Sequence, residues 1–129
     1  MESRIAERTF TFACRIVKLC ERLWTGSLPA RKIADRLFDA GTSIGANYRA
    51  ACRGKSTADV AHKLAIVEEE ADETIYWMEL LIDSDIVPAT KLSPLMSEVN
   101  EIIAMTVSSI KTLRSKQRQS KIQNQKSKI

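Results

Sequence analysis

Apolar residues recur every three to four positions along most of this chain, which is the spacing of one face of an α-helix. The first such segment extends from about Glu2 to Trp24. Its main apolar face consists of Ile5, Phe12, Ile16, Leu19 and Leu23. A second apolar set occupies the adjoining arc: Ala13, Val17, Cys20 and Trp24. Together they cover about half of the helix circumference, more than a small bundle needs to bury, so we expect part of this surface to contact another subunit.

Two glycines distinguish the second predicted helix. Gly26 and Pro29 mark the loop before it, and its apolar pattern extends to about Cys52. Gly41 and Gly45 lie four residues apart inside the helix, where each costs about 1 kcal/mol relative to alanine. Close approach of a neighbouring backbone would offset that cost.

The third predicted helix begins with a capping signal. Ser56, followed three residues later by Asp59, is typical of a helix N-terminus, and Gly54 ends the helix before it. One apolar stripe then continues to about Asp83: Val60, Leu64, Val67, Ala71, Ile75, Met78 and Ile82.

A fourth helix has two alternative beginnings, Pro88 and the Ser93–Pro94 pair. Its apolar positions extend to Leu113, and after about Ser115 the sequence becomes polar, basic and low in complexity. We therefore predict a bundle of residues 1–115 and a basic tail of residues 116–129 that is either a frayed helix end or disordered. No segment alternates with the period of a β-strand for long. The expected fold is all-α, an antiparallel up-and-down four-helix bundle.

Composition agrees with a single helical domain and excludes a membrane-spanning protein. The chain has 129 residues, 5% aromatics, four glycines and three prolines. Cys14, Cys20 and Cys52 form neither an even set nor a CxxC pair, so we expect buried thiols without a disulfide in a reducing compartment. No stretch resembles a signal peptide or reaches the roughly 20 apolar residues that a bilayer span needs. We expect a cytoplasmic protein with no membrane partner.

Charge is segregated along the chain. Residues 1–55 carry 11 Lys/Arg and 5 Asp/Glu, residues 56–110 carry 2 and 11, and residues 111–129 carry 7 and none. The net charge of +4 hides two basic segments around an acidic one. Such asymmetry indicates polyanion binding, self-association, or both.

Catalytic chemistry finds little support in the residues. The single histidine, His62, has no metal-ligand spacing to a second histidine or a cysteine, and it cannot supply a Ser/His/Asp constellation. The acidic cluster of residues 68–73 lacks the Glu-x-x-His motif of di-iron bundles, so we interpret it as a solvated face with partners among arginines of other helices. We predict no enzyme activity, no metal and no cofactor; a carboxylate-bound metal enzyme is the weak alternative.

Basic side chains supply the candidate binding residues. Five share one stripe of about 80° along about 27 Å of the first helix: Arg4, Arg8, Arg15, Lys18 and Arg22. This stripe suits a phosphate backbone, and equally suits ion pairs with the acidic third helix of a neighbouring subunit. For Arg49 and Arg53 we favour pairing with Glu69 and Glu73 inside the bundle. The C-terminal candidates are Lys111, Arg114, Lys116, Arg118 and Lys121, in a segment with no core to serve.

A second face of the third helix combines apolar groups with carboxylates, as protein interfaces do. Together with the wide apolar arc of the first helix it predicts a homo-oligomer. The expected interface residues are Val17, Trp24, His62, Ile66, Trp77 and Leu80. The alternative is that the third-helix residues simply flank a wide core stripe.

Two stretches resemble a known family. They are SIGANYRAA at residues 43–51 with RGKS at 53–56, and VEEEADET at 67–74 leading to WMELL at 77–81. Both are similar to the bacterial four-helix bundle proteins encoded in ribosomal RNA intervening sequences, a family similar in turn to the accessory variability determinant of diversity-generating retroelements. The resemblance covers roughly residues 5–114. Many members continue the motif with Ile-Ala-Glu-Gly where this chain has Tyr-Arg-Ala-Ala at 48–51, which indicates a subgroup.

The resemblance implies a bundle that assembles into a ring, typically a pentamer, without catalytic residues. For the retroelement branch it also implies binding to nucleic acid and to a reverse transcriptase. Ser43, Asn47 and Glu73 match the family motif, and we interpret them as structural, because buried polar groups between helices must find partners. We therefore expect a non-catalytic, sequence-tolerant RNA- or DNA-binding accessory protein. The alternative is a homo-oligomeric protein scaffold that binds no nucleic acid.

Overall fold

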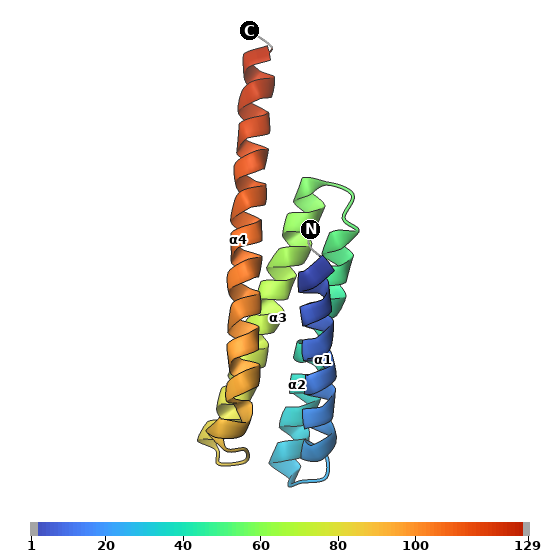
Figure 1. The fold of residues 1–129 in the computed structure, drawn as a ribbon, viewed down its shortest axis with the longest axis vertical. Helices are drawn as coiled ribbons and strands as arrows, with labels where there is room; N and C mark the ends of the chain where they lie inside the picture. The colour runs from blue at the N-terminus through green and yellow to red at the C-terminus, as the bar shows by residue number, and fades with distance from the viewer. Residues whose placement is uncertain (1–2, 128–129) are drawn as a thin grey trace.

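The computed structural model describes residues 3–127, which form four long α-helices (Figure 1). They are α1 (Ser3–Leu23), α2 (Leu28–Cys52), α3 (Thr57–Asp83) and α4 (Ala89–Ser127). Successive helices run in opposite directions, and no strand occurs between residues 3 and 127. The predicted all-α, up-and-down four-helix bundle is confirmed, and its assembly into a ring stays a prediction.

Local capping explains where most helices begin. The Ser27 hydroxyl accepts a hydrogen bond from the amide of Ala30, and Ser56 accepts one from Asp59 at 3.1 Å, as its spacing predicts. Helix α4 begins directly after Pro88, so the first of the two predicted beginnings is right. Pro94 lies inside the helix, where it removes one backbone donor.

The core lies between all four helices and is almost entirely aliphatic. Among the fully buried side chains are Phe12 and Ile16 of α1, Tyr48 of α2, Met78 of α3 and Ile102 of α4. Helix α2 packs against α1 and α3, and α3 packs against α4, whereas α1 and α4 contact each other least. Few contacts therefore join α1 to α4, so each polar contact between these two helices contributes a large share of what holds them together.

The two glycines of α2 lie where α1 crosses closest. A Cβ atom at Gly41 would lie 2.9 Å from both γ carbons of Ile16, and one at Gly45 would lie 3.2 Å from the carbonyl oxygen of Thr9. The predicted close approach of a neighbouring backbone is thus confirmed at Gly45, whereas at Gly41 the close neighbour is the Ile16 side chain. Both contacts fix α1 against α2.

Helix α4 extends well beyond the bundle, which differs from the prediction of a frayed or disordered tail. Its 39 residues span about 58 Å, and its C-terminal part passes the ends of the other three helices (Figure 1). Leu113 and Gln117 are half-buried, and residues 118–126 are exposed. No glycine or proline follows Pro94, so no residue of the terminating kind interrupts the helix where the apolar pattern stops. We call residues 116–127 the α4 overhang.

Candidate nucleic-acid interface

Three segments far apart in the sequence lie at the same end of the molecule. The start of α1, the connection between α2 and α3, and the distal half of α4 all lie at this end (Figure 1). Each carries exposed cations, and we call this region the basic end. Its exposed cations include Arg4, Arg53, Lys55, Lys111, Arg114, Lys116, Arg118, Lys121 and Lys126. Arg53 was expected to pair inside the bundle. Arg53 and Lys55 both lie in the connection between α2 and α3, and this position is the signal that could have grouped them with the other cations of the basic end.

Four of the predicted cations on α4 share one face. Lys111, Arg114, Arg118 and Lys121 follow one another at three- and four-residue spacing and line a shallow depression of about 470 Å³ together with Gln117. Lys116 lies two residues, or about 200° around the helix, from both Arg114 and Arg118. The structure therefore brings four of the five C-terminal candidates together and separates Lys116 from them.

These cations pair with no carboxylate within the described part of the chain. No acidic residue occurs between Glu101 and the end of the chain. Between residues 3 and 127 the ion pairs join Arg8 to Glu98 and Glu101, and Lys18 to Glu21. A row of exposed, like-charged side chains on one helix face repels itself in the free protein and gains from binding an anion.

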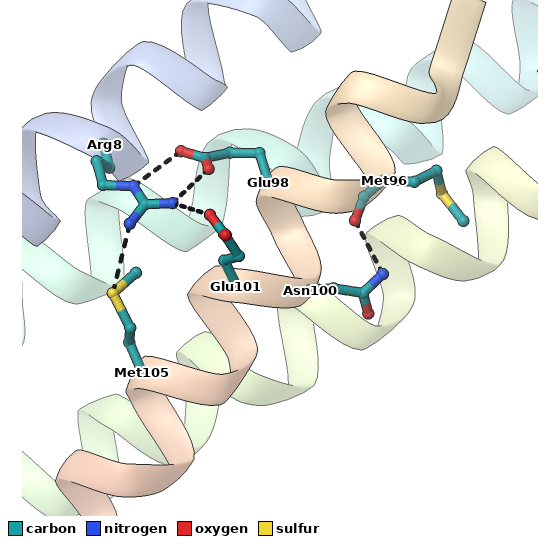
Figure 2. A network of polar contacts seen from close by, with 6 residues as sticks. All are labelled: Arg8, Met96, Glu98, Asn100, Glu101 and Met105. Carbon is teal, nitrogen blue, oxygen red and sulfur yellow. Dashed lines mark hydrogen bonds and ion pairs between the residues drawn. The ribbon is translucent and has the colours of Figure 1, made fainter. Parts of the chain in front are cut away.

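Arg8 differs from the prediction, because its guanidinium is occupied within the chain. Nε donates to Glu98 Oε2 at 3.1 Å, Nη2 donates to both Glu98 and Glu101, and Nη1 lies 3.6 Å from the sulfur of Met105 (Figure 2). These contacts cross the α1–α4 side of the bundle. They raise the pKa of Arg8 and, chiefly through the hydrogen bond, lower the pKa of Glu98. Arg8 is therefore a member of an ion pair within the chain, and its predicted phosphate contact would have to compete with Glu98 and Glu101.

The rest of the first-helix stripe is exposed. Arg4, Arg15 and Arg22 have no carboxylate partner among residues 3–127, whereas Lys18 pairs with Glu21 at 3.4 Å on the same helix. Arg15 also contributes to lowering the pKa of Glu98. The stripe thus borders carboxylates of α4, which makes it a poorer phosphate site than the distal half of α4.

Arg49 and Arg53 do not make the predicted ion pairs with α3. Arg49 instead lies over the ring of Phe10, 5.8 Å from its centroid. Glu69 and Glu73 are exposed on the outer side of α3 and have no arginine partner among the described residues.

The predicted interface residues lie on two separate faces. Val17 is half-buried, and the Trp24 ring packs at a tilt against Phe38 with ring centroids 5.5 Å apart; both lie on the α1–α2 side. The other four lie on α3: His62 is exposed, and Ile66, Trp77 and Leu80 are half-buried. Trp77 and Leu80 also pack against the core, so the alternative of a wide core stripe accounts for part of their burial.

The motif residues make contacts within their own helices, which corrects the prediction of partners between helices. The Ser43 hydroxyl donates to the carbonyl of Asp39, and Asn47 Nδ2 donates to the carbonyl of Ser43 at 2.9 Å. Glu73 is exposed and accepts a hydrogen bond from the Trp77 indole. A four-residue spacing satisfies each group locally.

The acidic cluster of α3 faces solvent. Glu69, Asp72 and Glu73 are exposed, and the pKa of half-buried Glu70 is raised by partial burial and by neighbouring carboxylates. Within residues 3–127, no three His, Cys, Asp or Glu side chains are arranged to hold a metal ion.

The three thiols are free, but only Cys20 is buried as expected. Its sulfur lies 3.4 Å from the carbonyl of Ala34, and burial raises its pKa to about 12. Cys14 and Cys52 are exposed. Of the helices described, none is long and apolar enough to cross a membrane.

Comparison with known proteins supports the resemblance to the ribosomal RNA intervening-sequence proteins, and the similarity to the retroelement determinant stays a prediction. The profile of the 23S rRNA-intervening sequence protein family matches residues 1–108. The chain belongs to this family. A crystal structure of a protein of unknown function from the S23 ribosomal protein family of Bacteroides thetaiotaomicron is similar, with 34% identity and a TM-score of 0.77 over 83% of this chain and 98% of that one. No curated protein matches.

The residues matched by the family profile do not include the row of cations on α4. The matched residues end at 108, before the first cation of the α4 face at Lys111. The bundle is therefore what this chain shares with the 23S rRNA-intervening sequence protein family, and the distal half of α4 is an extension beyond the matched region.

Proposed function

We propose that this protein is a non-catalytic, sequence-tolerant nucleic-acid-binding accessory protein that contacts phosphates with its basic end. The observation that carries the proposal is the unneutralised cation row on α4, Lys111, Arg114, Arg118 and Lys121, which continues past the bundle. Each phosphate contact releases condensed counterions and so adds affinity without reading sequence. The name of the family, which refers to ribosomal RNA, is compatible with this role.

In this proposal the bundle and the distal half of α4 have different roles. Helix α4 projects from the bundle as an arm, and Arg4, Arg53 and Lys55 add positive charge at the same end of the bundle. The resemblance to the retroelement determinant extends the proposal to a partner, a nucleic-acid enzyme such as a reverse transcriptase, in the cytoplasm. That partnership stays a prediction.

Charge reversal on the arm tests the proposal. We expect Arg114→Glu with Arg118→Glu to weaken binding of a generic duplex by at least tenfold at low salt, because two attractive contacts become repulsive. Arg31→Glu with Lys32→Glu is the matched control, since both residues are exposed in the first turns of α2 at the opposite end. Equal losses in the two variants, or none in either, would count against a specific role for the basic end.

A second candidate function, self-association, has its own observation. An apolar groove of about 320 Å³ runs between α1 and α2, lined by Ala6, Phe10, Ala13, Val17 and Ala46 among others. Phe10 lies at the edge of the groove and is 57% exposed, so its ring extends the apolar surface that an interface could bury. We propose that the homo-oligomer, with the ring as its expected form, buries this groove.

Sedimentation separates this candidate from a purely electrostatic assembly. An oligomer closed by the groove should persist at high salt and dissociate in Val17→Glu, because burying a charge there is unfavourable. An oligomer held by basic α1 against acidic α3 should instead dissociate at high salt. A monomer in all conditions would remove self-association.

A further inference from the structure

We infer that the α4 overhang seats in the major groove of duplex DNA. The inference rests on the proposed nucleic-acid function and names the polymer that the basic end takes. It is carried by the shape of the overhang, by the arrangement of its cations and amides, and by the position of the aromatic side chains.

The overhang has the dimensions of a groove-binding element. Residues 118–126 are exposed on every side, so none of this stretch is committed to the bundle. Twelve helical residues span about 18 Å, and a helix with its side chains is about 10–12 Å across. The major groove of B-form DNA is about 12 Å wide and admits one α-helix. A projecting helix can enter it without the bundle meeting the backbone first.

Cations flank the overhang on two sides, as a groove with two phosphate walls requires. Arg114, Arg118 and Lys121 point to one side, and Lys116 lies about 200° from Arg114 and Arg118. A helix lying flat on a polyanion would use one side only and would leave Lys116 in solvent. A helix between two sugar-phosphate backbones uses both sides.

The overhang also carries amides suited to base edges, and two of them, Gln117 and Asn124, lie seven residues apart and so share the helix face between Lys116 and the row of Arg114, Arg118 and Lys121. Gln117, Gln119, Asn124 and Gln125 belong to the overhang, and the last three are exposed. Asparagine and glutamine bond adenine at N6 and N7 in the major groove, and their reach adapts to several base pairs. Binding would then be dominated by phosphates, with a modest preference at adenine steps.

Single strands and RNA duplexes fit this element less well. Single-strand sites stack bases on aromatic side chains, and no Phe, Tyr or Trp follows Trp77 in the chain. The exposed aromatics Phe10, Trp24 and Tyr76 all lie outside α4. The major groove of A-form RNA is too deep and narrow for side chains to read. Duplex DNA remains as the polymer whose groove matches the helix.

Competition with the full-length protein tests the inference. A labelled 20-base-pair DNA duplex would be displaced by unlabelled duplex DNA, by duplex RNA of the same sequence, and by each single strand. We expect duplex DNA to compete at least tenfold better than the others. A DNA duplex in which 7-deazapurines replace the purines keeps every phosphate and removes the N7 acceptors, so we expect it to compete several-fold less well.

Two variants locate the contact without disturbing the bundle. Lys116→Ala should weaken DNA binding about as much as Lys121→Ala, because each faces one wall of the groove. Equal competition by DNA, RNA and single strands, with no effect of 7-deazapurines or Lys116→Ala, would overturn groove seating and leave phosphate binding intact. Absence of binding to every polymer at low salt would overturn the proposed function as well.

Discussion

The Arg8 guanidinium joins α1 to α4 on the side of the bundle where those helices touch least. Its two carboxylate partners, Glu98 and Glu101, lie one turn apart, so one planar group holds two successive turns of α4 (Figure 2). Removing Glu98 leaves the half-buried Arg8 with only the exposed carboxylate of Glu101 as an ionic partner. The ion pair is therefore a point where a polar contact contributes to closing the bundle.

Glu98→Gln should lower the free energy of unfolding by about 1 kcal/mol at pH 7. The pKa of Glu98 is lowered in the folded protein, so its contribution is present above the ordinary carboxyl pKa and is lost as the pH falls through the lowered value. Urea unfolding at pH 7 and in acid measures this. Glu79→Gln, at an exposed position of α3, is the control. A Glu98→Gln deficit that persists unchanged in acid would contradict the ionic origin.

Gly41→Ala should destabilise the protein by about 1–3 kcal/mol, although alanine favours helices. The added methyl would meet both γ carbons of buried Ile16 at 2.9 Å. Thermal and urea unfolding measure the effect. In an Ile16→Ala background the obstacle is gone, so the same substitution should cost little; equal costs in both backgrounds would exclude the predicted contact.

How far residues could be predicted from sequence depends on what each contact needs. The glycine pair was predictable, because a helix tolerates glycine at a cost that a close neighbour explains. The partners of Arg8 could not be predicted, because a helical wheel shows which face of α1 carries the side chain but not which helix packs against that face. Ser43 and Asn47 were misassigned for another reason: a carbonyl four residues earlier in the same helix satisfies such groups without a partner helix.

At the level of elements, α4 differs most from its pattern. The loss of apolar residues after Leu113 was interpreted as the start of a frayed helix end or a disordered tail, but in the structure it marks the end of packing and the helix continues to Ser127. Glycine and proline are the residues that most often end a helix, and neither occurs between Ser115 and Lys126. The other boundaries were predictable because Ser27, Ser56 and Pro88 mark them with local chemistry.

Ser120→Pro tests whether the helical form of the overhang matters. Proline removes one hydrogen bond and clashes with the carbonyl of Lys116, so the distal part of the helix should kink or melt. Ser120 is exposed and beyond the packed region, so the urea midpoint of the bundle should not change. Affinity for duplex DNA should fall several-fold, while Ser120→Ala should bind normally. A loss of bundle stability would show that the overhang packs on the bundle after all.

Across the whole molecule, charge is separated in space as well as in sequence. The acidic surface of α3 and the basic end give the chain a polarity that orients it toward a polyanion and repels α3 from the same surface. The bundle architecture followed from apolar periodicity alone. The position of the start of α1, the α2–α3 connection and the distal half of α4 at the same end could not be predicted from that periodicity, because it depends on the register of antiparallel helices of unequal length.

The salt dependence of binding tests the central claim most directly. The affinity of the full chain for generic duplex DNA and RNA would be measured from low to physiological salt. Each phosphate contact on duplex DNA contributes about −0.9 to the slope of log K against log salt. We predict a slope steeper than about −3, a reduction of about 2 in Arg114→Glu with Arg118→Glu, and no change in Arg31→Glu with Lys32→Glu. A slope near zero, or no binding at low salt, would contradict the account.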